Sequence, residues 1–143
     1  MTTCPCQSGK TFEACCGRFL SRKEQPETAE ELMRSRYSAF VRRDIAYLKE
    51  TLWPKLQKSL DVTGLAEWAE TKHWIGLEIL RTEAGGPDDT RGMVLFIARS
   101  LDGGKVTEHR ENSAFRKKKG RWYYVSAVAE NQALALLRSV KGG

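Results

Sequence analysis

The stretch from Thr28 to Val41, TAEELMRSRYSAFV, determines how the main domain begins. Thr28 and Glu31 form a capping box, in which each side chain bonds a backbone N–H that the first helical turn leaves free. Apolar side chains then recur at helical spacing and predict one buried stripe, formed by Ala29, Leu32, Met33, Tyr37, Phe40 and Val41. The sequence therefore predicts an amphipathic helix as the first element of the domain.

Two shorter helices follow in the prediction. Asp44 is expected to cap a helix that must stop before Pro54, because proline disfavours the helical conformation at the residue before it. Thr63 is expected to cap the next helix, and a last helix is predicted over 131–140.

Between these helices the pattern changes to strands, which are rich in aliphatic and aromatic residues. We expect paired strands over 73–81 and 93–99, joined by a turn at 85–88, and a second pair over 106–115 and 122–128. Lys119-Gly120 is predicted to form the tip of the second hairpin. Helices followed by strands indicate an α+β domain, with the helices packed on one face of an antiparallel sheet.

The composition is that of an ordinary globular protein, with 41% hydrophobic and 29% charged residues among 143. No run approaches the roughly 20 apolar residues of a membrane span, and the N-terminus lacks the pattern of a secretory signal. We therefore expect a cytoplasmic protein, whose thiols stay reduced. The net charge of +6 is compatible with an acidic partner or with a basic solvated surface.

Residues 21–28 contain no apolar side chain and one proline, which indicates a linker. They divide a module at 1–20 from a domain at 29–143. The module holds all four cysteines, Cys4, Cys6, Cys15 and Cys16.

These cysteines predict one structural zinc ion per chain, held by four thiolates in a closed tetrahedral site. Lys10 and Arg18 are placed to offset the negative charge of such a site. A Cys6–Cys15 disulfide is the alternative that a reducing compartment disfavours, and the segment lacks the Cys-x-x-Cys spacing of a redox centre. Because four protein ligands leave no open position, catalysis at this metal is not expected.

Two resemblances add to this prediction. Cys4-Pro5-Cys6-Gln7-Ser8-Gly9-Lys10, followed by Cys15-Cys16-Gly17, resembles the SEC-C motif, the zinc module that serves as a docking element in the translocase motor ATPase. The stretches Leu32–Phe40, Glu111-x-Ser113-x-Phe115 and Gly120-Arg121-Trp122-Tyr123-Tyr124 resemble the YchJ family, also called UPF0225. That resemblance implies an NTF2-like fold, a curved sheet wrapped by helices that often encloses a pocket, and implies no particular activity.

Strand alternation suggests which residues would line such a pocket. His109, Glu111 and Ser113 share one face of their strand and would form an acid–base set if that face is concave. Arg36 and Tyr37 on the first helix complete the candidate pocket. The simpler expectation is that Glu111 pairs with Arg34 or Arg36 and fixes helix to sheet, because buried charges are normally paired.

The second hairpin tip carries five basic residues, Arg116, Lys117, Lys118, Lys119 and Arg121. This cluster is expected either to be solvated or to contact phosphate in RNA or the ribosome.

Three functional hypotheses follow. The leading one is a non-enzymatic adaptor that docks a protein partner through its zinc module. The alternatives are a small-molecule-binding or enzymatic domain with a pocket around Glu111, and an RNA-associated or ribosome-associated protein. An arginine partner for Glu111 and no cavity of about 300 Å³ beside it would exclude the pocket. Oligomeric state remains open.

Overall fold

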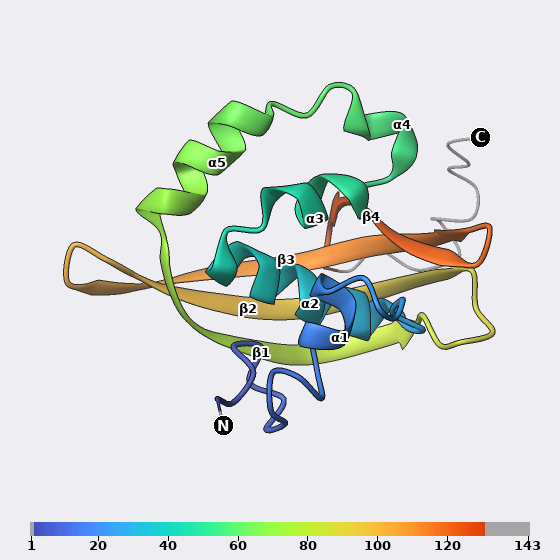
Figure 1. Ribbon diagram of the computed structural model, residues 1–143, viewed down its shortest axis with the longest axis horizontal. Coiled ribbons are helices and arrows are strands. Elements are labelled where there is room, and N and C mark those ends of the chain that lie inside the picture. The colour runs from blue at the N-terminus through green and yellow to red at the C-terminus, as the bar shows by residue number, and fades with distance from the viewer. Residues whose placement is uncertain (1, 131–143) are drawn as a thin grey trace.

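The computed structural model describes residues 2–130. Five helices precede four strands: α1 (Gly17–Leu20), α2 (Ala29–Arg42), α3 (Ile45–Glu50), α4 (Pro54–Gln57), α5 (Val62–Thr71), β1 (His73–Ala84), β2 (Arg91–Asp102), β3 (Lys105–Lys118) and β4 (Arg121–Val128). The predicted α+β class is confirmed, and the helices gather on one face of the sheet (Figure 1). The helix predicted over 131–140 lies outside the described residues.

The four strands form one antiparallel sheet in the order β1-β2-β3-β4. Both predicted pairs are present, and β2 also pairs with β3 from Arg91↔Arg116 to Asp102↔Lys105. Two turn residues with positive φ join β3 to β4, Lys119 at 52° and Gly120 at 78°, as the hairpin prediction requires. Gly103 and Gly104 do the same between β2 and β3, a hairpin that the sequence analysis did not identify.

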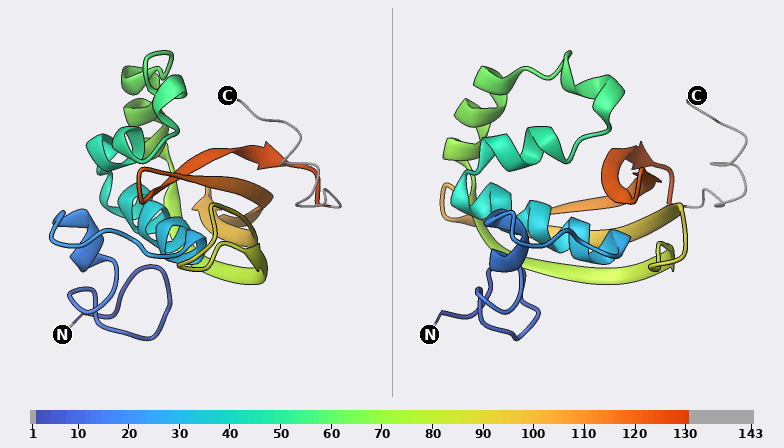
Figure 2. Two further views of the ribbon diagram at one scale, coloured as in Figure 1. Left: turned by 90° about the vertical axis from the view of Figure 1, so that its right-hand side faces the viewer. Right: turned by 45° about the vertical axis from the view of Figure 1, so that its right-hand side comes forward.

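The sheet curves around α2 (Figure 2). Register shifts interrupt β1 between Trp74 and Gly76 and again between Ile79 and Arg81, and a third lies between Ala114 and Phe115 where β3 pairs with β4. Such irregularities bend a strand and increase its twist. The inner, concave face of the sheet is therefore turned toward the helices.

Helix α2 is the central element of the domain. Thr28 caps it by accepting a bond from the Glu31 N–H, while the Glu31 carboxylate accepts from the N–H of Glu27, one residue before the expected position. Besides its apolar stripe, the helix buries Ser35, Arg36 and Ser38. These polar residues are buried because the cysteine segment, α3 and the sheet all pack against α2.

The later helices are short, and the residues at their N-termini determine where each one begins. Asp44 caps α3 as predicted, and Pro54 occupies the first turn of α4, where its missing N–H costs nothing. The prediction for α5 was wrong by two residues: Asp61 is the cap, accepting from the Gly64 N–H, and Thr63 lies inside the helix. The carboxylate of Asp61 reaches this N–H from the N-cap position, so α5 begins earlier.

The cysteine segment packs into the same core as the rest of the chain. Cys6 and Cys16 are fully buried and belong to one hydrophobic cluster with Leu32 of α2 and Phe115 of β3. Within residues 2–130, no helix has the length and apolar character needed to cross a membrane.

Candidate metal centre and ligand cavity

The cysteine loop is shaped by two residues in the left-handed region. Gln7 has a φ of 63° and Gly9 a φ of 90°, and between them the chain reverses so that the Cys4 N–H bonds the Lys10 carbonyl at 2.9 Å. Cys15 and Cys16 follow directly before α1, with Cys16 at its N-cap. The loop and the start of α1 thereby bring all four sulfurs together.

The geometry of the sulfurs fits a tetrahedral metal ion. All four lie within 4.8 Å of one another, with 3.6 Å between Cys6 Sγ and Cys15 Sγ and 4.0 Å between Cys15 Sγ and Cys16 Sγ. Zinc–sulfur bonds of about 2.3 Å in a tetrahedron require sulfur separations of about 3.8 Å. A disulfide requires about 2.05 Å, and all four cysteines are free, so the Cys6–Cys15 disulfide is not formed.

The pKa values of the cysteine thiols are also consistent with a bound metal ion. Hydrogen bonds from Cys16 and Cys6 lower the pKa of Cys4, whereas the pKa of Cys16 is raised, first by its bonds to Cys4 and Cys6 and then by burial. Cys4 and Cys16 therefore do not both ionise beside each other without a cation. A divalent ion would take four thiolates and release the protons that they share.

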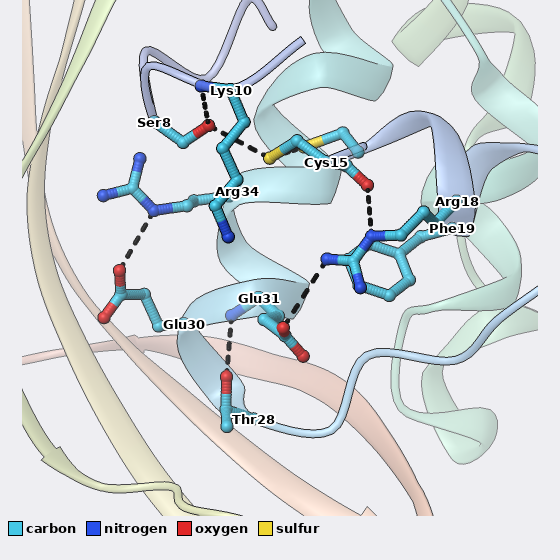
Figure 3. A pocket seen from close by; sticks show the side chains of 10 residues that line it. Ser8, Lys10, Cys15, Arg18, Phe19, Thr28, Glu30, Glu31 and Arg34 are labelled. Carbon is cyan, nitrogen blue, oxygen red and sulfur yellow. Dashed lines mark hydrogen bonds and ion pairs between the residues drawn. The ribbon is translucent and has the colours of Figure 1, made fainter. Parts of the chain in front are cut away.

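Arg34 of α2 is the cation in closest contact with this centre. Its Nη1 atom donates to the Cys6 carbonyl at 2.9 Å and lies 3.9 Å from Cys6 Sγ, while its Nε donates to Glu30. Arg18 contributes differently, because its Nε donates to the Cys15 carbonyl at 3.0 Å. Lys10 was also expected to offset the thiolate charge. It lines a groove beside Cys15 (Figure 3), and its part in offsetting that charge stays a prediction.

Gln7 attaches the loop to the sheet. Its side-chain oxygen accepts from the Leu77 N–H at 3.2 Å, and its amide nitrogen donates to the Ile75 carbonyl at 3.3 Å. These backbone groups lie at the register shift around Gly76, on the edge strand of the sheet. No strand of the sheet lies beyond β1, so backbone groups that face outward from this edge have no ladder partner, and the Gln7 amide supplies one.

A second feature is a cavity of about 220 Å³ between the helices and the inner face of the sheet. Every residue of the predicted pocket lines it, namely Arg36, Tyr37, His109, Glu111 and Ser113. Aromatic and apolar side chains that were not predicted for the site complete the wall: Met33, Phe40, Trp68, Trp74, Phe96, Ala98 and Tyr124. The cavity therefore has apolar walls and a polar group of residues on β3 and β4.

The Glu111 carboxylate is held by uncharged hydroxyls and an imidazole. It accepts from Ser113 Oγ at 2.6 Å and Tyr124 Oη at 2.8 Å, and its other oxygen lies 2.9 Å from His109 Nε2. Because an ionised carboxylate only accepts, Nε2 carries the proton in that contact. Burial raises the pKa of Glu111, but the bonds from Ser113, His109 and Tyr124 together leave that pKa below its ordinary value.

The expected pairing of Glu111 with Arg34 or Arg36 is wrong. Arg34 is engaged at the cysteine loop, and Arg36 donates through Nη1 to the Leu48 carbonyl at 2.9 Å and to Thr51 Oγ1 at 2.7 Å. The Arg36 guanidinium also lies 4.7 Å from the centre of the Tyr124 ring. The short helix α3 and the segment after it supply the acceptors that the carboxylate was expected to supply.

The basic hairpin is folded onto aromatic rings. Arg116 and Lys118 lie over Trp53, Lys117 lies over Trp122, and Arg121 lies over Tyr123. Successive residues point to opposite sides of the strand, so these cations do not form one continuous charged surface.

The chain is similar to known proteins over most of its length. Residues 28–127 match the family described as "YchJ, middle NTF2-like domain", and residues 2–18 match the SEC-C motif. The chain belongs to the YchJ (UPF0225) family. A UPF0225 protein of Geobacter sulfurreducens is 47% identical over 121 residues, which cover 85% of this chain and 75% of the relative. A UPF0225 protein of Haemophilus influenzae is 45% identical over 124 residues, with the same two coverages.

Two solved structures resemble this YchJ-family chain. The solution structure of a SEC-C motif containing protein from Rhodopseudomonas palustris has a TM-score of 0.83 and 38% identity, covering 91% of this chain and 100% of that one. The crystal structure of a SEC-C motif containing protein from Psychrobacter arcticus has a TM-score of 0.80 and 28% identity, covering 93% and 85%.

Within the YchJ-family fold, two parts of the sites differ from the prediction. Arg34 was assigned to the sheet although it serves the cysteine loop, and no local pattern distinguishes it from Arg36. The aromatic wall of Phe40, Trp68 and Trp74 was not predicted for the site, because only packing between α2, α5 and β1 brings these rings together.

Proposed function

We propose that this protein is a small-molecule-binding domain whose fold depends on a structural zinc ion. The observation that carries the proposal is the position of Glu111, a carboxylate held by Ser113, Tyr124 and His109, and by no cation other than the His109 imidazole within residues 2–130, inside an aromatic-walled cavity. Concave apolar sites with a few polar groups at fixed positions are typical of ligand pockets.

The size of the cavity limits the ligand. At about 220 Å³ it is smaller than the roughly 300 Å³ at which drug-sized pockets begin. A cavity of about 150 Å³ suffices for benzene. The expected ligand is therefore one ring with a small polar substituent.

The zinc ion, in this proposal, supports the fold and takes no part in chemistry. Four thiolates leave no open position on the ion, and the cluster is buried in the core beside α2. Native mass spectrometry should find one zinc per chain. A chain purified without zinc that keeps its cavity and its stability would contradict this role.

Ligand binding is tested by amide and indole NMR spectra of the zinc-loaded protein during titration with single-ring fragments at up to millimolar concentration. Fragments that bind should move the indole signals of Trp68 and Trp74, which line the cavity, and leave Trp53 unchanged. Ala98→Leu fills part of the cavity and should abolish these shifts while the protein remains folded. The absence of any fragment that moves the cavity signals would overturn the proposal.

Docking of a protein partner is a second candidate function, favoured by a groove of about 380 Å³ beside the cysteine loop. Figure 3 shows Lys10, Arg18 and Arg34 on this groove together with Glu30 and Glu31 from the first turns of α2. Such mixed charge suits a polar partner whose charges are complementary.

Cysteine variants are a poor test of docking because the thiols belong to the core. Cross-linking in cells should instead compare the wild type with Lys10→Glu, using Lys119→Glu on the distant hairpin as the matched control. A partner lost from Lys10→Glu and retained by Lys119→Glu would support docking at the groove. Identical cross-links from both variants would count against it.

A further inference from the structure

Hydrogen-bond donors at the cavity outnumber the acceptors that the protein offers them. Arg36 and Trp74 both line the cavity, and each carries N–H groups for which no acceptor exists among the described residues 2–130. A buried polar group without a partner is costly, so these groups point to what a ligand must supply.

Arg36 is the stronger of the two. The residue is only 9% exposed, and burial lowers the pKa of its guanidinium to about 10. Of its five N–H groups, those on Nη1 bond Leu48 and Thr51, and within the described chain those on Nε and Nη2 have no acceptor. No carboxylate of residues 2–130 forms an ion pair with it, so the cation is buried without a counter-charge in contact.

Trp74 adds a neutral donor. Its Nε1 atom is fully buried and, in the part of the chain that the structure describes, has no acceptor. Its ring packs edge-on against Tyr37 and tilted against Phe40 and Trp68, at centroid distances of 6.2, 6.4 and 6.0 Å. The indole therefore belongs to the apolar wall and still requires an acceptor.

Glu111 does not invite a cation in the same way. Its oxygens already accept bonds from Ser113, Tyr124 and His109. A ligand ammonium would have to displace one of them and would then share the cavity with the Arg36 cation. The groups left without a partner are donors, so the unmet demand at this site is for an acceptor at Arg36 and Trp74.

We propose that the cavity binds a single-ring carboxylate, with its carboxylate on Arg36 and the Trp74 indole N–H and its ring against the wall that Phe40, Trp68 and Trp74 form. This inference rests on the proposed function, since it names the ligand class for the same cavity. Charged acceptors are preferred because a hydrogen bond to an ion is about twice as strong as one between neutral groups.

Three probes of one size separate the inference from the proposed function: benzoate, benzamide and benzylamine. Each is titrated into the zinc-loaded protein while the indole NMR signals are followed. Benzoate should bind roughly tenfold or more tightly than benzamide, with benzylamine weaker still, and should shift the Trp74 indole proton downfield. Equal binding of benzoate and benzamide, or preference for benzylamine, overturns the inference and leaves ligand binding intact. Failure of all three overturns both.

Two variants test the assigned donors. Trp74→Phe keeps a ring in the wall and removes the indole N–H, and should weaken benzoate binding severalfold, whereas Trp53→Phe, outside the cavity, should not. Arg36→Met should reduce the preference for benzoate over benzamide to about one. Unchanged benzoate binding by either folded cavity variant overturns the inference. If Arg36→Met does not fold, Trp74→Phe and the order of the three probes decide it.

Discussion

Arg34 Nη1 lies 2.9 Å from the carbonyl oxygen of Cys6 and 3.9 Å from the sulfur of the same residue. This contact joins the centre of α2 to the cysteine loop, and the other end of the guanidinium is held by Glu30. Groups that orient metal ligands in this way contribute substantially to metal affinity. The stability of the domain and the affinity of the metal site are therefore expected to be linked through α2.

Replacing Arg34 by Met should weaken zinc binding by about 10- to 100-fold, because it removes the donor to Cys6 and a cation that offsets thiolate charge. Competition with a chromophoric chelator measures the effect. Glu30→Gln is the matched control, since it removes the ion pair with Arg34 and leaves the contact with Cys6. Equal zinc affinities in wild type and Arg34→Met would show that the contact is incidental.

Removing the metal should destabilise the whole domain and not the loop alone. Cys6 and Cys16 share their hydrophobic cluster with Leu32 and Phe115, so four unpaired thiols would disturb the packing of α2 on the sheet. We expect chelation to lower the Tm by roughly 10 °C or more, with a single unfolding transition. Thermal unfolding monitored by circular dichroism measures this change. A chelated protein with an unchanged Tm, or with a separate small transition, would contradict this.

Gln7→Ala should cost about 1–2 kcal/mol of unfolding free energy, because two hydrogen bonds to the edge strand are lost. The amide protection of Leu77 should fall at the same time, as measured by hydrogen exchange. Gln57→Ala is the matched control, because it removes an amide that bonds the carbonyl groups of Glu50, at the end of α3, and Leu52, just after it. Protection at Leu77 that survives Gln7→Ala would mean that the loop is held in another way.

Glu111 should make the stability depend on pH. Because its pKa is lower in the folded chain than its ordinary value of 4.5, the ionised form stabilises the fold above that value, and this contribution is lost as the pH falls through the folded pKa. Glu111→Gln should therefore be less stable than the wild type at pH 7, with the difference narrowing below pH 4.5.

Urea unfolding of both proteins at several pH values checks this prediction. Zinc loss in acid affects the two proteins alike, so it cancels in their difference. Parallel stability profiles across the acid range would mean that Glu111 is not the responsible group.

Features that depend on neighbours along the chain could be predicted from the amino-acid sequence. Cysteine spacing identified the four sulfurs, Thr28 and Asp44 marked the starts of α2 and α3, and Lys119-Gly120 marked a hairpin. Strand alternation placed His109, Glu111 and Ser113 on one face. Capping, turn geometry and the two-residue period of a strand all act over a few residues, so a sequence pattern carries them.

Contacts between groups that are distant in the sequence depend on how the helices pack on the sheet. Arg34 and Arg36 are two residues apart on one helix, yet one contacts the cysteine loop and the other the end of α3. The Glu111 carboxylate accepts a hydrogen bond from Tyr124 on the adjacent strand, where an arginine had been expected. The bulges curve the sheet and thereby set the position of α2, which no local sequence pattern encodes. This position determines which partners each buried charge contacts. It also determines the cavity between α2 and the sheet.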